Sequence, residues 1–205
     1  MKEVAIVNYG AGNLGSLINA IEFLNYKVII LDKPKKNKFF SHIILPGVGA
    51  FGALAKNLVK LKFKDYLIEH KERQKKILGI CVGMQLLFEK SEEGKEHKGL
   101  EIIKGKIEKF NFKTNSKLPL PNVGFLKVFY DNNSKIWNQI PNNSYFYFVH
   151  SYRLKNIQDN INFGKSNYGE EFISYVEKNN IFGTQFHPEK SHKVGLKLLD
   201  NFLKC

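Results

Sequence analysis

Cysteine is scarce in this 205-residue chain, which contains Cys81 and Cys205 and no other. The two lie far apart with no CxxC spacing, so neither a disulfide framework nor a zinc site is indicated. No apolar stretch approaches the roughly 18 residues that a membrane span requires, and the N-terminal apolar run is too short for a signal peptide. We therefore expect a soluble protein of a reducing, cytoplasmic compartment, with no metal and no membrane partner.

Acidic residues are also few, with 19 Asp and Glu against 32 Lys and Arg, which gives a formal charge of +13. Such an excess raises the possibility of nucleic-acid binding. However, the lysines are spread in short groups such as 33–38 and 71–76, without an RNA-binding aromatic motif or a recognition helix. We interpret them as solvated surface, with an acidic partner surface as the alternative, and expect no nucleic-acid partner.

With 43% hydrophobic residues, the chain can form one compact domain over residues 1–205. Its first half alternates β-rich runs with amphipathic helical stretches, which predicts an α/β fold: a wound, mostly parallel central sheet with helices on both faces. The expected strands are Val4–Val7, Val28–Leu31, Ile43–Leu45 and Ile77–Ile80, and the expected helices are Leu14–Leu24, Leu58–Ile68 and Met84–Glu89.

After Glu89, β-rich runs follow one another with Asn- and Gly-containing turns, which predicts a smaller antiparallel strand region. A last amphipathic helix is expected over Ser191–Leu203. The expected strands of this half are Ile102–Phe110, Val123–Tyr130, Tyr145–Val149, Phe172–Val176 and Ile181–Phe186.

One motif, Gly10-Ala11-Gly12-Asn13-Leu14-Gly15, is a formal GxGxxG between a strand and a helix, and Asp32 ends the next strand. Glycines there would let a pyrophosphate approach the helix N-terminus, and an acidic residue about 20 positions on could hold a ribose. A tight turn that needs glycine for backbone freedom fits the same residues. The motif alone leaves a dinucleotide site and a structural turn both open.

A second motif, Gly79-Ile80-Cys81-Val82-Gly83, has the spacing of a nucleophile elbow, where a strand turns sharply into a helix. The N-terminus of that helix favours a thiolate, and the Val82 N–H would face a developing oxyanion. A buried cysteine acting as a small hydrophobic residue is the alternative. The glycine spacing favours the nucleophile.

A thiol nucleophile needs a base, and His187-Pro188-Glu189 follows the last expected strand. Catalytic groups lie at strand ends in wound α/β sheets, and Glu189 is placed to orient the second imidazole nitrogen of His187. The turn at Pro46–Gly49 could supply a second oxyanion donor. His150 fits a substrate-contacting turn and a structural hydrogen bond equally well.

Together these residues resemble the class I (triad) glutamine amidotransferases, a flavodoxin-like fold, and among them the glutaminase subunits of imidazole glycerol phosphate synthase. The resemblance covers essentially the whole chain, and its motifs occur in the family's order. They are NYGAGNLG (8–15), PGVGAFG (46–52), GICVGMQLLF (79–88), YFVHSY (147–152) and GTQFHPEKS (183–191).

The resemblance implies that Cys81 is the nucleophile, His187 the base and then the acid, and Glu189 the orienting carboxylate. It implies no cofactor, and it makes the GxGxxG a loop near a partner interface. The remaining implied positions are oxyanion donors at Val48 and Val82, glutamine contacts at Gly47, Gln85, Glu93, Ser151 and Tyr152, and partner contacts at Asn13, Phe125, Leu126 and Tyr147.

The implied partner is a cyclase subunit with a (β/α)₈ barrel, which forms a heterodimer with the chain and uses its ammonia to make imidazole glycerol phosphate and an aminoimidazole carboxamide ribotide. One departure bears on this: a Met-Gly-Trp-Asn-like segment is expected where the chain reads Asn122-Val123-Gly124-Phe125-Leu126. An ammonia-supplying glutaminase for a bacterial surface-sugar amidotransferase is therefore an alternative. A non-catalytic scaffold subunit is disfavoured because all three catalytic residues are present.

Overall fold

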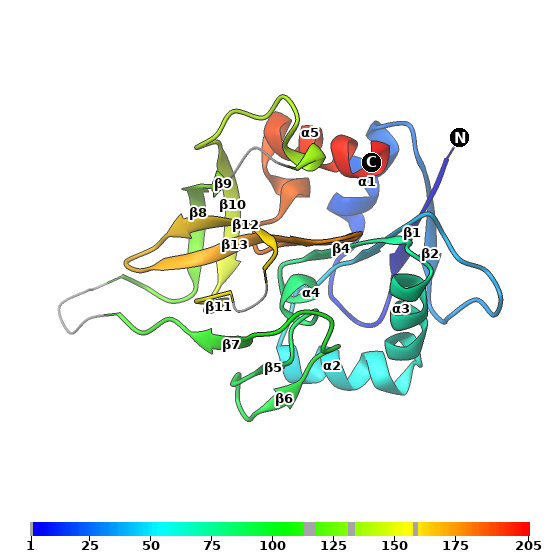
Figure 1. Ribbon diagram of the computed structural model, residues 1–205, viewed down its shortest axis with the longest axis horizontal. Coiled ribbons are helices and arrows are strands. Elements are labelled where there is room, and N and C mark those ends of the chain that lie inside the picture. The colour runs from blue at the N-terminus through cyan, green and yellow to red at the C-terminus, as the bar shows by residue number, and fades with distance from the viewer. Residues whose placement is uncertain (1, 113–117, 131–133, 158–159) are drawn as a thin grey trace.

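The computed structural model describes residues 2–112, 118–130, 134–157 and 160–205. Among these, a parallel group of five strands forms one half of the central sheet, in the order β2-β1-β3-β4-β14 (Figure 1). Their bounds are β1 Glu3–Val7, β2 Lys27–Leu31, β3 His42–Leu45, β4 Lys76–Ile80 and β14 Ile181–Thr184. The predicted wound, mostly parallel sheet is confirmed.

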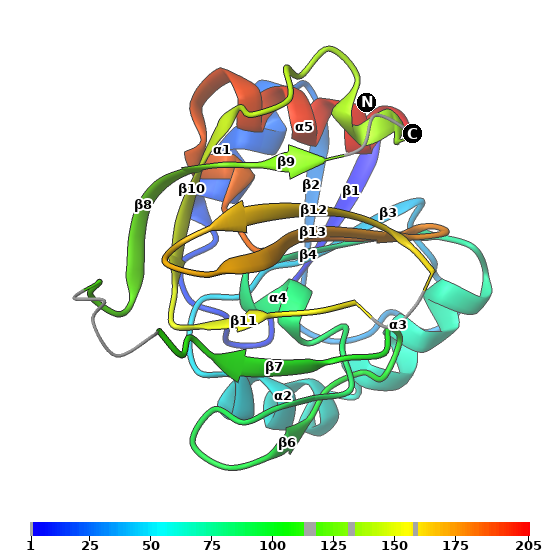
Figure 2. The ribbon, with the colours of Figure 1, turned by 60° about the vertical axis from the view of Figure 1, so that its left-hand side comes forward.

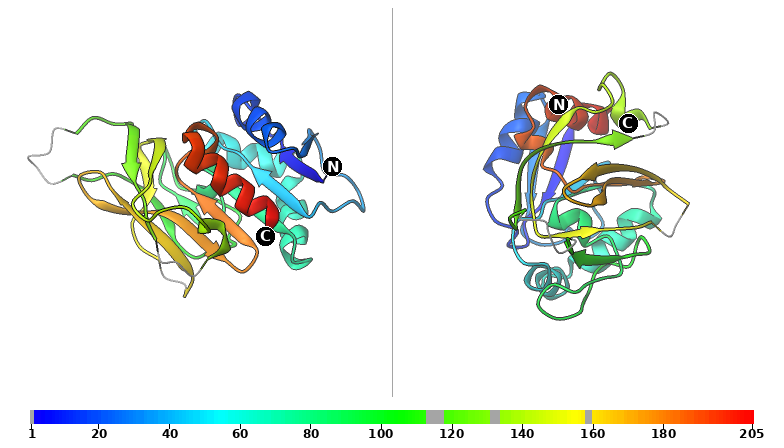
Figure 3. Two further views of the ribbon diagram at one scale, coloured as in Figure 1. Left: turned by 90° about the horizontal axis from the view of Figure 1, so that it is seen from above. Right: turned by 90° about the vertical axis from the view of Figure 1, so that its left-hand side faces the viewer.

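Helices cover both faces of this parallel half, which explains why its inner strands are continuous apolar runs rather than alternating ones. Helices α1 (Gly15–Phe23) and α5 (His192–Lys204) lie on one face, and α2 (Phe51–Lys60) and α3 (Phe63–Glu72) on the other (Figures 1 and 3). All residues of β3 are buried, as are 4–7 of β1 and 77–80 of β4.

The helix expected over Leu58–Ile68 was wrong, because two helices occupy that region. α2 ends at Lys60 and α3 begins at Phe63, and between them Lys62 has a left-handed φ of 60°. Phe63 and Leu67 are buried on one helix and Leu58 on the other, so the apolar spacing continued across a break that the pattern did not reveal.

The second half of the sheet is mainly antiparallel and extends from β14 through β13, β11, β7, β5 and β6 (Figure 2). β12 pairs with β13 and β9, and a separate two-stranded sheet joins β8 to β10. The bounds are β5 Lys90–Ser91, β6 His97–Lys98, β7 Lys106–Lys109, β8 Asn122–Lys127, β9 Phe129–Tyr130, β10 Tyr145–His150, β11 Tyr152–Leu154, β12 Asn162–Asn167 and β13 Glu171–Lys178.

Several expected boundaries differ from the observed ones. The strand expected over Ile102–Phe110 is confined to β7, and β14 ends two residues before Phe186. The helix expected over Met84–Glu89 is the single turn α4 (Val82–Gln85). The remaining elements are two 3₁₀ turns, η1 (Lys135–Trp137) and η2 (Pro188–Lys190).

Three strands of the parallel half end at one place, where their connecting turns pack backbone against backbone. β3 leads into Pro46, β4 into Cys81 and β14 into Gln185. A Cβ added to Gly83 would lie 1.9 Å from the Leu45 carbonyl oxygen. The close approach of these turns therefore requires glycine at position 83.

We expect Gly83→Ala to destabilise the fold by more than about 2 kcal/mol, because its methyl group overlaps backbone atoms that cannot rotate away. Thermal unfolding would measure the loss. Gly94→Asn is a matched control, since nothing lies within 4 Å of a Cβ there and asparagine tolerates its φ of 72°. Equal melting temperatures for the wild type and Gly83→Ala would contradict the close approach.

Candidate active site

Cys81 occupies the sharp turn between β4 and α4, with φ 54° and ψ −113°. This left-handed conformation is strained for a residue with a side chain. Two backbone hydrogen bonds hold it: the Cys81 N–H donates to the Thr184 carbonyl at 2.7 Å, and the Cys81 carbonyl accepts from the Gln85 N–H at 3.1 Å. The thiol is 3% exposed and its Sγ lies 3.7 Å from the Val149 carbonyl oxygen.

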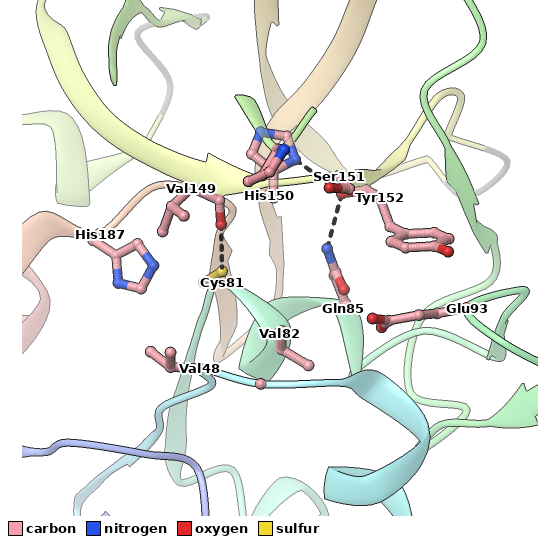
Figure 4. Close-up of a pocket in the computed structure, with 12 residues that line it drawn as sticks. Val48, Cys81, Val82, Gln85, Glu93, Val149, His150, Ser151, Tyr152 and His187 are labelled. Atoms are coloured by element: carbon pink, nitrogen blue, oxygen red, sulfur yellow. Dashed lines mark hydrogen bonds between the residues drawn. The ribbon is translucent and has the colours of Figure 1, made fainter. Parts of the chain in front are cut away.

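His187 lies beside Cys81 at the end of the turn that follows β14 (Figure 4). Its Nδ1 is 2.7 Å from Glu189 Oε1, which fixes the ring orientation. Its Nε2 is buried and has no hydrogen-bond partner among the described residues. The ring therefore presents one nitrogen to the carboxylate and leaves the other for proton transfer at the sulfur.

The environment of His187 favours the charged imidazolium. Burial by itself lowers the pKa of His187, but Cys81 and Glu189 beside the ring outweigh burial and raise the pKa to about 10. The ordinary pKa is about 6.5, so the charged ring contributes stability that is fully present below about pH 6.5. That contribution is lost as the pH rises through about 10.

A pocket of about 240 Å³ opens above Cys81 and His187 (Figure 4). Most residues predicted for the site line it: Val48, Cys81, Val82, Gln85, Glu93, Ser151, Tyr152 and His187. Two predicted residues lie behind its wall, Glu189 beyond the imidazole and Gly47 against the Gly83 backbone. The lining also includes Gly49, Pro121, Val149 and His150.

Acceptor oxygens gather at the end of the pocket away from His187. Gln85 Nε2 donates to the Tyr152 carbonyl and to Gln185 Oε1, both at 3.0 Å, so its two N–H groups are used and its Oε1 remains for a ligand. Glu93 Oε2 accepts from the Phe51 N–H at 2.8 Å at the start of α2. This end of the pocket suits the ammonium group of an amino acid.

Both backbone donors expected for an oxyanion hole are engaged inside the protein. The Val82 N–H donates to the Gly47 carbonyl at 3.3 Å, and the Val48 N–H donates to the Ala11 carbonyl at 3.1 Å. The Gly47 carbonyl and the Val48 N–H belong to one peptide plane. Rotation of that plane would break both bonds together and expose both donors, which are not free for a ligand in this structure.

The GxGxxG loop packs against the turn Pro46–Gly49 that follows β3. The Tyr9 hydroxyl donates to the Pro46 carbonyl at 2.5 Å, and a Cβ on Gly12 would lie 3.2 Å from Val48 Cβ. Asn13 is exposed and its Oδ1 accepts from the Gly15 N–H. Asp32, the ribose ligand of the dinucleotide alternative, accepts from Asn8 instead. The glycines thus serve a tight turn beside the active site.

Three of the four residues predicted for the partner interface, Phe125, Leu126 and Tyr147, belong to the β8–β10 sheet, and they divide between its two faces. Phe125 is exposed, and its ring lies 5.5 Å from that of Tyr147 and 5.3 Å, stacked, from that of His192. Leu126 points the other way and packs against the core. Alternation along a strand places neighbours on opposite faces, so Phe125 and Leu126 cannot both meet a partner.

Sequence reasoning missed Gln185 and Asn122. Gln185 is fully buried, and its Nε2 is 3.7 Å from Cys81 Sγ. Asn122 is buried and donates to His150 Nε2 at 3.1 Å. A polar side chain inside an otherwise buried segment was the available signal, but its partners come from distant parts of the chain. Within the described residues, no group of three or more His, Cys, Asp or Glu side chains could hold a metal ion.

Comparison with known proteins defines the class. The family model described as glutamine amidotransferase class-I matches residues 5–205. The chain therefore belongs to the class-I glutamine amidotransferase family. Within it, the chain belongs with the proteins called imidazole glycerol phosphate synthase subunit HisH: it is 47% identical to the one from Methanocaldococcus jannaschii over 201 residues, which cover 98% of each chain.

Further relatives agree. The subunit HisH of Chlorobium chlorochromatii is 42% identical over 200 residues, covering 97% of this chain and 98% of that one. Among solved structures, PurLQS from Thermotoga maritima aligns with a TM-score of 0.76 at 21% identity, over 99% of this chain and 98% of the other. That structure supports the fold. Among the described residues, none of the helices has the length and apolar character of a membrane span.

We expect Cys81→Ala to lower the pKa of His187 from about 10 by roughly 1–3 units, because the group that most strongly favours the imidazolium is removed. Imidazole NMR resonances followed from pH 6 to 11 would measure the change. His150 is an internal control, since burial lowers its pKa to about 4 and it stays neutral over that range. An unchanged His187 midpoint in the variant would contradict the pairing.

Proposed function

We propose that this chain is the glutaminase subunit of imidazole glycerol phosphate synthase, which hydrolyses glutamine and passes the ammonia to a cyclase subunit in histidine biosynthesis. The observation that carries the chemistry is the placement of His187 and Glu189 beside the Cys81 elbow in one pocket. The HisH relatives, which match nearly the whole chain, support the pathway.

Hydrolysis proceeds in two steps. The Cys81 thiolate attacks the side-chain carboxamide carbon of glutamine, and the tetrahedral oxyanion that forms collapses as the C–N bond breaks. His187, charged at neutral pH, donates its Nε2 proton to the leaving ammonia. The neutral imidazole then takes a proton from water, which attacks the γ-glutamyl thioester and releases glutamate and the thiolate.

The pocket orients glutamine along its length. The carboxamide lies over Cys81, and the α-ammonium group lies at Gln85 Oε1 and the Glu93 carboxylate, where acceptors gather. The backbone at Ser151 and Tyr152 lines the wall between them. Such fixed geometry at both ends favours a substrate with the reach of a glutamine side chain.

The partner is a cyclase with a (β/α)₈ barrel that docks on the outer face of β8–β10. Phe125 and Tyr147 offer rings there, and the exposed Asn13 belongs to the loop that packs on the oxyanion turn. Ammonia released into water would be protonated and lose its nucleophilicity, so a protected route into the partner is needed. A reducing cytoplasmic compartment and a single domain over residues 1–205 belong to the same proposal.

The alternative acceptor, a surface sugar, rests on the segment Asn122–Leu126, where the sequence departs from the family pattern. Phe125 supplies an aromatic ring to the outer face there, and Asn122 is buried in the wall behind the pocket, so the proposed docking face has an aromatic side chain at this segment despite the different residues. No feature of the described residues favours the sugar acceptor over histidine biosynthesis.

We expect Cys81→Ala to lose glutamine hydrolysis by at least about 10⁴-fold in the complex with the cognate cyclase, because the nucleophile is removed. Glutamate release measures the loss. In a strain that lacks its own glutaminase subunit, the wild-type chain with its cyclase should restore growth without histidine, whereas Cys81→Ala should not. Growth supported by the variant at limiting ammonia would contradict the nucleophile. Failure of a verified active pair to rescue growth would favour the sugar pathway.

Because both oxyanion donors are engaged, we expect the isolated chain to hydrolyse glutamine slowly and the partner with its acceptor ligand to accelerate it. Each donor contributes about 10²–10³ in rate, so an increase of at least that size is expected. Glutamate release by the chain alone, with the cyclase, and with the cyclase and acceptor ligand provides the comparison. A Cys81→Ala preparation sets the background. Equal turnover in all three conditions would contradict the closed hole.

A further inference from the structure

A chain of hydrogen bonds leads from β8 to the catalytic sulfur, and Figure 4 shows one of its links, from Gln85 to Tyr152. Its last member is Gln185, whose side chain is fully buried and whose backbone N–H is fixed to the Ser174 carbonyl at 2.9 Å. Gln185 Nε2 lies 3.7 Å from Cys81 Sγ, within hydrogen-bond distance for sulfur.

The orientation of the Gln185 amide is set by its other end. Gln85 Nε2 donates to Gln185 Oε1 at 3.0 Å, which makes that atom the oxygen and leaves the NH₂ group toward the sulfur. The amide of Gln85 is set in turn by the Tyr152 carbonyl, which accepts its other N–H. An inverted Gln185 would place two N–H groups against each other.

The chain continues through a neutral histidine. The Tyr152 carbonyl also accepts from His150 Nδ1 at 2.8 Å, and His150 Nε2 accepts from the Asn122 amide at 3.1 Å. Burial lowers the pKa of His150 to about 4, so at neutral pH one proton is present and it lies on Nδ1. Each side chain has one orientation that satisfies all the bonds, and the four side chains of Asn122, His150, Gln85 and Gln185 are buried.

The neighbours of Cys81 Sγ favour different protonation states of the sulfur. The Val149 carbonyl, 3.7 Å away, accepts a hydrogen bond from the thiol and repels the thiolate, whereas an N–H donor stabilises the thiolate. Gln185 supplies such a donor without a charge of its own and keeps it in place whether His187 holds or has given up its proton.

We propose that Gln185 is a catalytic residue that stabilises the Cys81 thiolate through an N–H···S hydrogen bond, and that Asn122, His150 and Gln85 are positioning residues that fix its amide. The proposal deepens the glutaminase function and rests on it. Asn122 is the first residue of β8, which carries the face proposed for the partner. The chain of hydrogen bonds therefore begins at that sheet.

The test is the pH dependence of alkylation of Cys81 by iodoacetamide in the full-length chain, read by mass spectrometry of the peptide that contains Cys81 so that the free Cys205 does not contribute. Alkylation consumes thiolate but needs neither glutamine, an oxyanion hole nor a partner. Removal of the donor in Gln185→Met should move the pH midpoint upward by about one unit, which is about tenfold in rate below the midpoint. Gln185→Glu keeps the shape and, as a carboxylate, replaces the donor with a negative charge, so it should move the midpoint further in the same direction and serves if the first variant does not fold.

The other titratable groups that face the site stay in place in these variants: His187 and Tyr9 interact with Cys81, and His150 interacts with His187. Asn122→Leu should shift the midpoint upward by less than the Gln185 variants. Asn201→Leu is the matched control, a buried amide bonded to the Ile136 and Asn138 carbonyls far from the sulfur, and should leave the midpoint unchanged.

A folded Gln185 variant with the wild-type midpoint would overturn the proposal, even if its glutamine hydrolysis fell, because Gln185 would then be only structural. An unchanged midpoint in Asn122→Leu would overturn the positioning role. Since alkylation does not depend on glutamine, loss of the proposed glutaminase function in the wild type would be seen separately, in glutamate release.

Discussion

The active site depends on one constraint, the direct packing of backbone on backbone where β3, β4 and β14 end. A Cβ on Gly47 would lie 2.2 Å from the Gly83 nitrogen, and one on Gly83 would lie 1.9 Å from the Leu45 carbonyl oxygen. This approach brings the oxyanion turn against the elbow, and the bond from the Cys81 N–H to the Thr184 carbonyl brings the histidine strand beside them. Side chains at these positions would separate the groups that must act together.

The backbone of His187, the proposed base, is held by β10, the strand that carries part of the proposed docking face. The Tyr147 carbonyl accepts from the His187 N–H at 2.8 Å, while Ser191 Oγ accepts from the Tyr147 N–H and donates to the His187 carbonyl. Tyr147 also contacts Phe125 on the outer face of β8–β10. The same strand therefore carries a ring of the proposed docking face and a restraint on the catalytic imidazole.

Local pattern was enough to predict the alternation of strands and helices, the Cys81 elbow and the His187–Glu189 pair, because each depends on residues close in sequence. The break between α2 and α3 at Lys62 was not predicted, since a left-handed residue there leaves the apolar spacing intact. Gln185 was missed because its partners Gln85 and Cys81 lie about 100 residues away in sequence, and Asn122 because its partner His150 is brought to it by the pairing of β8 with β10. The closed state of the oxyanion hole depends on the Ala11 carbonyl, which no motif around Val48 reveals.

The single peptide plane between Gly47 and Val48 has a consequence for how the turnover of the enzyme can be regulated. Because its carbonyl engages one donor while its N–H is held by Ala11, one rotation releases both donors together. Molecules in a preparation would then be either competent or silent. An effector that raises measured turnover would do so by changing the fraction of competent molecules, leaving the turnover of each one as it was.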